Sequence, residues 1–542
     1  MQGLMQFHPL MISSAIEFAA LYHGDTEVVS RRVEGDIHRS NYATINRRAK
    51  QVAQALDALG LAQSARVGTL AWNGYRHFEL YYGVSGSGRV LHTLNPRLHP
   101  EQLAWIVNHA EDEVLAFDMS FLPLVKAVAS KLPTVKHFIA LCDAAQLPAD
   151  SGIPNLQSYE AWLAPNGGDY TWPVFDENLA AGLCYTSGTT GHPKGVLYSH
   201  RSSMLHALAS AATDVIGICS RDTVLPVVPM FHVNAWGLPY LMPMVGAKVV
   251  FPGAALDGKS IYELFESEGV TMSAGVPTVW QMLLAYMDAN QLKLSTMKRT
   301  VIGGSACPPA MLDAFRDRYG VTVNHAWGMT EMSPLGTFGT LKGTQLHASA
   351  DAQRATLLKQ GRAVFGVDMK IVDGEGHELP RDGVAAGDLM VRGSWIIEQY
   401  YRGEGGSILD ADGYFSTGDV ATLDADGFMQ ITDRSKDVIK SGGEWISSID
   451  VENIAMAHPA VAMAACIGVR HPKWDERPML VVVKKPNVEV SAQDILHFYE
   501  GKIAKWQIPD AVQFVDAIPL GATGKMQKTK LREMFKEFTL SA

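Results

Sequence analysis

The segment YTSGTTGHPKG, residues 185–195, is rich in glycines and small hydroxyl residues and contains one lysine. Such a loop lets successive backbone N–H groups face one point, while the hydroxyls add further donors. This arrangement binds phosphate, with Lys194 supplying positive charge. A flexible Ser/Gly linker is the alternative, and the Walker pattern does not fit because Gly195 follows Lys194. The loop residues predicted to bind phosphate are Thr186, Ser187, Gly188, Thr189, Thr190 and Gly191.

Five further motifs lie after the loop along the chain. They are PMFHVNAWG (229–237), HAWGMTE (325–331), STGD (416–419), DRSKDVIKSGGEW (433–445) and PLGATGKMQK (519–528). Together with the loop, they resemble the signature of the AMP-forming adenylate enzymes, which include acyl-CoA synthetases, nonribosomal adenylation domains and beetle luciferases. The resemblance covers essentially the whole chain and is closest to bacterial fatty-acyl-CoA synthetases. It implies that a carboxylate and Mg-ATP give an acyl-adenylate and pyrophosphate, after which the thiol of CoA displaces AMP.

The resemblance assigns a nucleotide and metal site. Thr186 and Glu331 match the magnesium ligands of the family, and a hard divalent ion prefers oxygen ligands of this kind. Trp327 offers a flat apolar face for adenine, and the carboxylate of Asp419 can accept hydrogen bonds from both ribose hydroxyls. A solvated loop glutamate and an ordinary core tryptophan are the alternatives. The other residues implied to contact ATP or AMP are Lys194, Gly304, Ser305, Ala306, His325, Ala326, Gly328, Met329, Thr330 and Arg434.

The resemblance also implies residues for the two half-reactions. Lys525 matches the catalytic lysine of the family's small domain, where its charge offsets the negative charge of the transition state. Lys436 falls at the family's hinge, about which the small domain turns between the half-reactions. The loop after it is expected to line the CoA tunnel, with a plain hairpin turn as the alternative. Its residues are Lys440, which is also a candidate catalytic residue, Ser441, Gly442, Gly443, Glu444 and Trp445.

Evidence on the substrate comes from the PMFHVNAWG motif. Amino-acid-activating relatives carry an aspartate that pairs with the α-ammonium, and His232 stands there in this chain. We therefore expect an apolar carboxylate in a pocket formed by the candidate catalytic His232, Val233, Trp236 and Gly303. A short- to medium-chain fatty acid and 3-methylmercaptopropionate both fit, because a thioether resembles a methylene. The chain ends 17 residues after Lys525 without a carrier domain, which favours free CoA as acceptor.

The elements that position these motifs follow an alternation of strands and helices. Helical spacing of apolar residues at 45–59 precedes a strand at 66–72, and this rhythm is typical of an α/β fold with largely parallel sheets. We read residues 223–247 as buried strand and loop, because four prolines interrupt them. After about residue 410 short strands with glycine turns indicate a small α+β domain, with a helix near 492–505. The predicted division is 1–433 for the large domain, 434–436 for the hinge and 437–542 for the small domain.

Composition excludes several classes of protein. The 542 residues include 46 Lys+Arg and 56 Asp+Glu, a net charge of −10 that argues against binding nucleic acid or anionic membranes. With 47% hydrophobic residues the chain reads as globular. Five scattered cysteines without a CxxC pair, and a start without a signal-peptide pattern, favour the cytoplasm. We also expect a homodimer from the resemblance. A luciferase-like oxidase and a nucleotide-binding protein without turnover are the less favoured functions.

Overall fold

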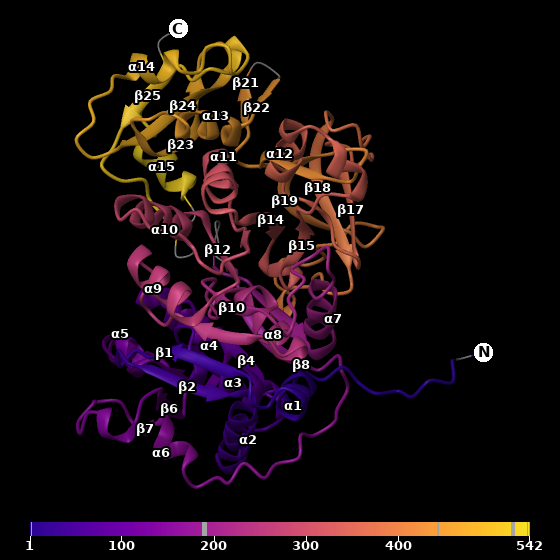
Figure 1. Cartoon of the computed structure of the whole chain (residues 1–542), viewed down its shortest axis with the longest axis vertical. Helices are drawn as coiled ribbons and strands as arrows, with labels where there is room; N and C mark the ends of the chain where they lie inside the picture. The colour runs from indigo at the N-terminus through magenta and orange to yellow at the C-terminus, as the bar shows by residue number, and fades with distance from the viewer. Residues whose placement is uncertain (2, 187–191, 442–443, 522–525, 539, 541–542) are drawn as a thin grey trace.

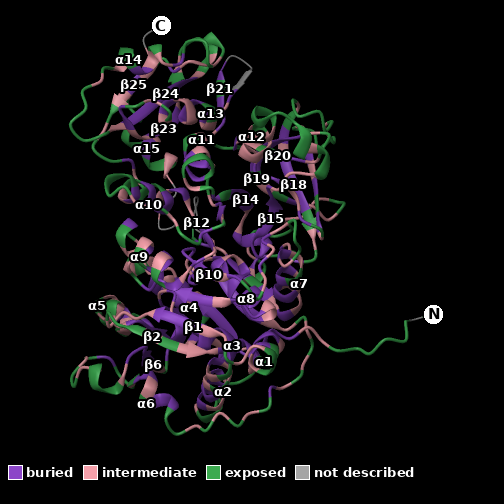
Figure 2. Cartoon of the chain, viewed as in Figure 1, coloured by how far each residue is buried: buried purple, intermediate pink, exposed green. Residues whose placement is uncertain are grey.

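The computed structural model describes residues 1, 3–186, 192–441, 444–521, 526–538 and 540. Within these residues the strands form four sheets, which Figure 1 shows as a large N-terminal body and a smaller C-terminal unit. Figure 2 shows that the central strands of the large body are buried. This is the α/β architecture with largely parallel sheets that the sequence predicts.

A seven-stranded sheet leads into the phosphate loop. Its order is β7-β6-β5-β3-β4-β8-β9, and all neighbours are parallel except the β8–β9 pair. The strands are β3 (Arg66–Leu70), β4 (Val90–Thr93), β5 (Asp112–Phe117), β6 (His137–Ala140), β7 (Leu156–Ser158), β8 (Ala180–Tyr185) and β9 (Gly195–Ser199). The loop therefore lies between the two strands of an antiparallel edge hairpin.

A nine-stranded sheet, of order β16-β15-β14-β13-β12-β10-β11-β1-β2, holds most of the remaining motifs. It is parallel from β1 through β14 and antiparallel at both edges. Its strands are β1 (Glu27–Arg31), β2 (Ile37–Asn41), β10 (Thr223–Pro226), β11 (Lys248–Phe251), β12 (Met272–Gly275), β13 (Arg299–Ile302), β14 (Thr322–Gly328), β15 (Leu335–Phe338) and β16 (Arg362–Ala363).

The last two sheets are smaller. A four-stranded antiparallel sheet contains β17 (Val367–Val372), β18 (Ala386–Gly393), β19 (Phe415–Leu423) and β20 (Met429–Arg434). The C-terminal sheet contains β21 (Ile439–Ser441), β22 (Glu444–Ile446), β23 (Val461–His471), β24 (Asp475–Lys484) and β25 (Ala511–Phe514). The first wholly antiparallel sheet thus begins at β17, earlier than the change near residue 410 that the sequence suggested.

Helices cover these sheets. They are α1 (Ile12–Tyr22), α2 (Tyr42–Ala58), α3 (Tyr75–Gly86), α4 (Pro100–Ala110), α5 (Leu122–Val128), α6 (Tyr159–Leu163), α7 (His200–Ser210), α8 (Leu238–Val245), α9 (Gly258–Glu268), α10 (Pro277–Ala289), α11 (Pro309–Asp313), α12 (Ala350–Leu358), α13 (Ser448–Met456), α14 (Ala492–His497) and α15 (Lys528–Met534). The helix predicted at 45–59 is confirmed as α2. Asn41 caps it by accepting the N–H of Thr44 at 2.9 Å, and its apolar face is buried.

Two expectations about helices were wrong. Residues 238–245 form α8, although Pro239 and Pro243 suggested a loop. Pro239 lies in the first turn of the helix, where a backbone N–H has no partner within the helix, so its absence costs nothing. Pro243 has no N–H to donate to the carbonyl of Pro239, and the hydroxyl of Tyr82 donates to that carbonyl instead. The helix expected near 492–505 ends at His497, because Tyr499 turns into the core and donates to the Val451 carbonyl at 2.7 Å.

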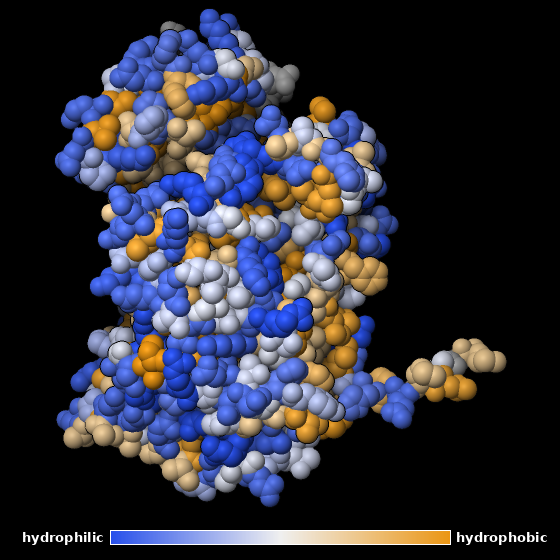
Figure 3. Space-filling model, viewed as in Figure 1, coloured by the Kyte–Doolittle hydropathy of each residue, from blue (hydrophilic) through white to orange (hydrophobic). Residues whose placement is uncertain are grey.

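The first residues of the chain extend away from the body as an arm (Figure 1), and Figure 3 shows apolar side chains on it. Leu4, Met5 and Phe7 on this arm are exposed. None of the helices in the described ranges is long and apolar enough to cross a membrane.

Candidate functional site

Thr186 and Lys194 close the base of the phosphate loop. The N–H of Thr186 donates to the carbonyl of Lys194 at 2.9 Å, and the N–H of Lys194 donates to Oγ1 of Thr186 at 3.1 Å. Both residues lie at the ends of the β8–β9 hairpin, so the strands fix where the loop begins and ends. The predicted phosphate-binding residues 187–191 lie outside the described residues.

Lys194 and Glu331 are brought together through Tyr400. The ammonium of Lys194 lies 4.7 Å from the centroid of the Tyr400 ring, and the Tyr400 hydroxyl donates to Oε1 of Glu331 at 2.7 Å. Burial and the neighbouring Glu331 carboxylate raise the pKa of Tyr400 well above its usual value, so the hydroxyl stays a donor. Sequence reasoning missed Tyr400, because no motif contains it.

The turn that carries Glu331 is held by backbone contacts from two other segments. It forms the short helix η6 (Thr330–Met332). The hydroxyl of Tyr198 on β9 donates to the Thr330 carbonyl at 2.6 Å, and the N–H of Ile397 donates to the Glu331 carbonyl at 2.8 Å. Glu331 itself is 8% exposed. These two bonds fix the backbone of the turn, and the Tyr400 hydroxyl fixes the carboxylate of Glu331.

These residues fit a magnesium site of the kind the sequence predicts. Thr186 supplies a hydroxyl and Glu331 a carboxylate, and magnesium is usually bound by one or two protein oxygens together with substrate phosphates. No group of three or more His, Cys, Asp or Glu that could hold a metal occurs among the described residues, so a metal cage made of protein alone is not present there.

The predicted ribose residues, Asp419 and Arg434, meet the predicted adenine residue, Trp327, and the three lie on three strands. The indole N–H of Trp327, on β14, donates to Oδ2 of Asp419 at 2.9 Å. Nε of Arg434 lies 3.4 Å from Oδ1 of the same carboxylate, because β19 and β20 pair Asp419 with Arg434. Trp327 is only 8% exposed and packs against Gly336. The indole thus orients Asp419, while contact with adenine stays a prediction.

His325 supports the loop predicted to flank adenine. Its Nε2 accepts the N–H of Cys307 at 3.3 Å, and Nδ1 lies 3.1 Å from the Leu358 carbonyl. Burial lowers the pKa of His325 to about 4, so the ring is neutral. The loop it supports contains Gly304, which has φ +81°, the exposed Ser305 and Ala306. The other predicted residues of this region lie at the end of β14 and in the turn after it, namely Ala326, Gly328, Met329 and Thr330.

The predicted acyl pocket brings Trp236 against Gly303. A Cβ on Gly303 would lie 3.0 Å from Cη2 of Trp236 and 2.9 Å from the carbonyl oxygen of Ala326. A larger residue at position 303 would therefore push the indole away. Val233 and Trp236 lie in η4 and His232 directly precedes it, so the Trp236–Gly303 contact brings all four predicted residues into one region. His232 and Trp236 are half-buried and Val233 is buried.

Residues on either side of the predicted hinge form hydrogen bonds with different parts of the chain. The N–H of Ser435 donates to the Gly418 carbonyl at 3.1 Å, and its hydroxyl donates to Asp388 at 2.7 Å. On the other side of Lys436, the guanidinium of Arg532 donates to Asp437 at 2.6 Å. Burial and the nearby Arg434 lower the pKa of Lys436.

The predicted CoA residues begin on β21. The N–H of Lys440 donates to Glu476 at 3.1 Å, and Ser441 accepts a hydrogen bond from Arg477 at 3.1 Å. The backbone of Glu444 and Trp445 forms the start of β22, and the structure does not describe their side chains. Gly442, Gly443 and the predicted catalytic Lys525 lie outside the described residues.

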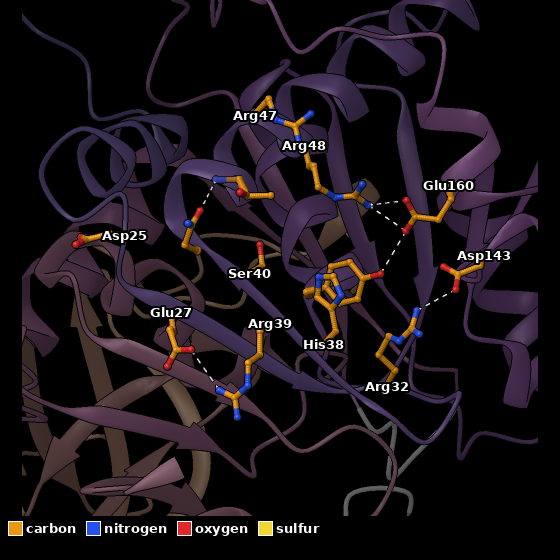
Figure 4. Close-up of a pocket in the computed structure, with 13 residues that line it drawn as sticks. Asp25, Glu27, Arg32, His38, Arg39, Ser40, Arg47, Arg48, Asp143 and Glu160 are labelled. Atoms are coloured by element: carbon orange, nitrogen blue, oxygen red, sulfur yellow. Dashed lines mark hydrogen bonds and ion pairs between the residues drawn. The ribbon is translucent and has the colours of Figure 1, made fainter. Parts of the chain in front are cut away.

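A cavity of about 650 Å³ lies among other residues of the N-terminal body (Figure 4). None of the predicted site residues lines it. Most of its charged side chains form ion pairs, as with Arg32 and Asp143 at 3.0 Å or Arg48 and Glu160 at 3.0 Å. These pairs leave no excess charge that would select a ligand.

Comparisons with known proteins agree with this arrangement. Residues 16–401 match the sequence profile described as AMP-binding enzyme, and residues 450–525 match the AMP-binding enzyme C-terminal domain. The chain therefore belongs to the family of AMP-binding enzymes.

Within this family the chain is similar to several named CoA ligases. It is 55% identical to the 3-methylmercaptopropionyl-CoA ligase of Ruegeria lacuscaerulensis, over 99% of both chains. It is 50% identical to the medium-chain-fatty-acid–CoA ligase of Ectopseudomonas oleovorans, over 100% of this chain and 98% of that one. Among solved structures, the anthranilate CoA ligase in complex with anthranoyl-AMP is 25% identical with a TM-score of 0.85, over 97% of this chain and 98% of that one.

Proposed function

We propose that this enzyme is an AMP-forming carboxylate–CoA ligase. In the first half-reaction a carboxylate oxygen attacks the α-phosphorus of ATP, the bond to the bridging oxygen breaks, and pyrophosphate leaves. In the second, the sulfur of CoA attacks the acyl carbonyl, AMP leaves with the bonding pair, and the thiol proton is released. The observation that supports this best is a line of contacts, in which Lys194 contacts the Tyr400 ring and the Tyr400 hydroxyl donates to Glu331. Lys194 also bonds to Thr186, where the phosphate loop starts.

Each residue of that line has a distinct role in the proposal. Lys194 attracts the phosphates, and Tyr400 holds one oxygen of Glu331 so that the carboxylate keeps one orientation. Magnesium held by Glu331, Thr186 and the phosphates would neutralise charge that develops on the leaving pyrophosphate. Asp419, oriented by Trp327, accepts hydrogen bonds from the ribose hydroxyls.

The small domain supplies the remaining groups of the proposal. We assign Lys525 to the charge on the pentavalent transition state, and Lys436 to the hinge between 1–433 and 437–542. Ser435 bonds to Asp388 of the large domain and Asp437 bonds to Arg532 of the small domain. Each flank of Lys436 is thus attached to its own domain, which supports a rotation of one domain against the other at this residue. The segment from Lys440 to Trp445 would then admit the narrow pantetheine arm of CoA.

The substrate in the proposal is an apolar monocarboxylate of short to medium length. His232 leaves no carboxylate at the position that would pair with an α-ammonium, and Trp236 limits the depth beside Gly303. A second candidate is 3-methylmercaptopropionate, because relatives 55% and 52% identical are named for its CoA ester. The two acids differ mainly by a thioether in place of a methylene, so an apolar pocket separates them weakly.

The test is a series of specificity constants. Straight-chain acids of about three to twelve carbons and 3-methylmercaptopropionate are compared in wild type and Trp236→Ala, because each buried methylene contributes about 0.8 kcal/mol. If Trp236 limits the pocket, the variant prefers longer acids and loses activity on the shortest. A parallel fall for every acid would refute the role of Trp236, and no activity with any acid in wild type would refute the ligase itself.

We include a homodimer in the proposal. The arm with exposed Leu4, Met5 and Phe7 offers apolar surface that a second copy could cover, and twofold dimers are the commonest oligomers. Light scattering at micromolar concentration should give twice the 59.0 kDa chain mass. A mass of one chain would contradict the dimer.

A further inference from the structure

Five consecutive residues of the predicted acyl region have a left-handed backbone. Along η4 (Val233–Gly237) the φ angles are +45°, +51°, +45°, +58° and +78°. Residues with a Cβ avoid this region, and a β-branched valine there is a clear outlier. Only Asn234 and Gly237 are residue types that adopt it readily. The surrounding structure must therefore hold the turn in place.

The side chain of Asn234 is the contact that fastens the turn. Its Oδ1 accepts the hydroxyl of Tyr81 at 3.2 Å and lies 3.6 Å from the thiol of Cys184, which donates to it. The carbonyl of Met230, just before the turn, shares this single hydroxyl proton and makes the shorter of the two contacts, so Tyr81 holds both residues to α3. Asn234 is 4% exposed, Tyr81 0% and Cys184 3%, so water cannot replace these contacts.

Cys184 joins the turn to the strand that enters the phosphate loop. It is the second-last residue of β8, and Thr93 on β4 fixes its sulfur at 3.2 Å. The turn is thus held on one side by α3, through Tyr81, and on the other by β8.

The turn ends in Trp236, whose ring meets Gly303. We propose that Asn234 is a positioning residue that holds this left-handed turn against Tyr81 and Cys184, and thereby sets where Trp236 limits the acyl pocket. The inference rests on the proposed ligase function, since it concerns which acids the pocket accepts. Asn234 acts through Trp236 and does not touch the reacting atoms in this account.

The test compares three substitutions at position 234. Asn234→Gly removes the side chain but accepts the left-handed backbone, Asn234→Ala removes it and keeps the strain, and Asn234→Asp keeps an oxygen acceptor. We expect Asn234→Gly to lower kcat/KM for the preferred acid by about 10- to 100-fold, as small misplacements of a binding residue do. The loss should fall on the KM for the acid, should differ between short and long acids, and should leave the KM for ATP unchanged. Asn234→Asp should keep the wild-type preference among acids.

A matched pair of tyrosine variants separates positioning from general damage. Tyr81→Phe removes the hydroxyl that reaches Asn234, whereas Tyr42→Phe removes an equally buried hydroxyl that donates to Ala247 at 2.6 Å. Only Tyr81→Phe should change the ratio of specificity constants between short and long acids. An equal fall for all acids in Asn234→Gly and Tyr81→Phe would overturn the inference.

A second readout does not depend on turnover. If the turn is strained and Asn234 holds it, Asn234→Ala should unfold at a lower temperature than Asn234→Gly, because only glycine removes the penalty for positive φ. Equal unfolding temperatures would also overturn the inference. A wild type that forms no CoA ester from any acid would refute the proposed function alone, since the unfolding comparison still tests how the turn is held.

Discussion

Removal of the Tyr400 hydroxyl tests the proposed phosphate and metal site with the smallest change to its surroundings. Tyr400→Phe removes the 2.7 Å hydrogen bond to Glu331 but keeps the ring that lies 4.7 Å from the Lys194 ammonium. A hydrogen bond to a charged group contributes about 1.5–3 kcal/mol. If that bond orients Glu331 in the transition state, its loss corresponds to about 10- to 150-fold in rate.

The assay is ATP–pyrophosphate exchange at increasing magnesium concentration. We expect Tyr400→Phe to lower kcat/KM for ATP and to need more magnesium for half-maximal exchange, because Glu331 is no longer held in one orientation. Tyr400→Leu also removes the ring that Lys194 contacts. Loss of this cation–π contact should reduce the stabilisation of the transition state by about 0.5–2 kcal/mol more.

The adjacent tyrosine supplies the control. Tyr401 follows Tyr400 in the chain, but its ring meets the ring of His109 edge-on, with 5.8 Å between the centroids. Tyr401→Phe should therefore keep the magnesium dependence of wild type. Exchange by Tyr400→Phe within about twofold of wild type at every magnesium concentration would refute the reasoning, because the removed bond would then contribute nothing to the transition state.

Three further predictions concern other parts of the chain. Lys525→Ala should lower pyrophosphate exchange by about 10²–10³ while the unfolding temperature is unchanged, and near-normal exchange would remove Lys525 from the mechanism. His206 is buried, accepts the N–H of Leu335 at 3.1 Å, and has its pKa lowered to about 3. The neutral His206 therefore contributes fully to the free energy of unfolding above the pKa of an unfolded histidine, near 6.5. This contribution is lost as the pH falls toward 3, and about 2 kcal/mol of it is lost by pH 5. Urea unfolding at pH 7 and pH 5 should show a smaller difference in His206→Gln than in wild type, and an equal difference would contradict the assignment. Lys528 pairs with the buried Glu452 at 2.7 Å, so Lys528→Met should destabilise the small domain by about 3–5 kcal/mol in thermal unfolding, and Lys528→Met/Glu452→Gln should recover part of the loss.

The sequence predicted the elements whose signals are local. The cap and apolar face of α2 are visible in the residues themselves, and Asp419 and Arg434 lie on two strands joined by a turn at Gly427, so their pairing follows from a hairpin. Residues 367–372 also alternate between apolar and polar types, and the burial of β17 follows this alternation, which is typical of a strand with one buried face.

Other features depend on contacts between distant segments and have no local signal. Tyr400 meets Glu331 across 69 positions of sequence, and it belongs to no motif. The left-handed turn at Val233–Trp236 consists mostly of residue types that avoid positive φ, so only its anchors on α3 and β8 explain it. The helix α8 forms despite Pro243 because Tyr82 satisfies the Pro239 carbonyl from another helix.

In the proposed reaction the enzyme joins an apolar acid to CoA through an acyl-adenylate. The most direct measurement is a single turnover with ATP, CoA and the preferred acid, quenched at successive times and analysed by mass spectrometry. We expect acyl-AMP and pyrophosphate to appear first, and acyl-CoA then to form as AMP is released in equal amount. Formation of ADP and phosphate, or of acyl-CoA without a preceding acyl-adenylate, would contradict it.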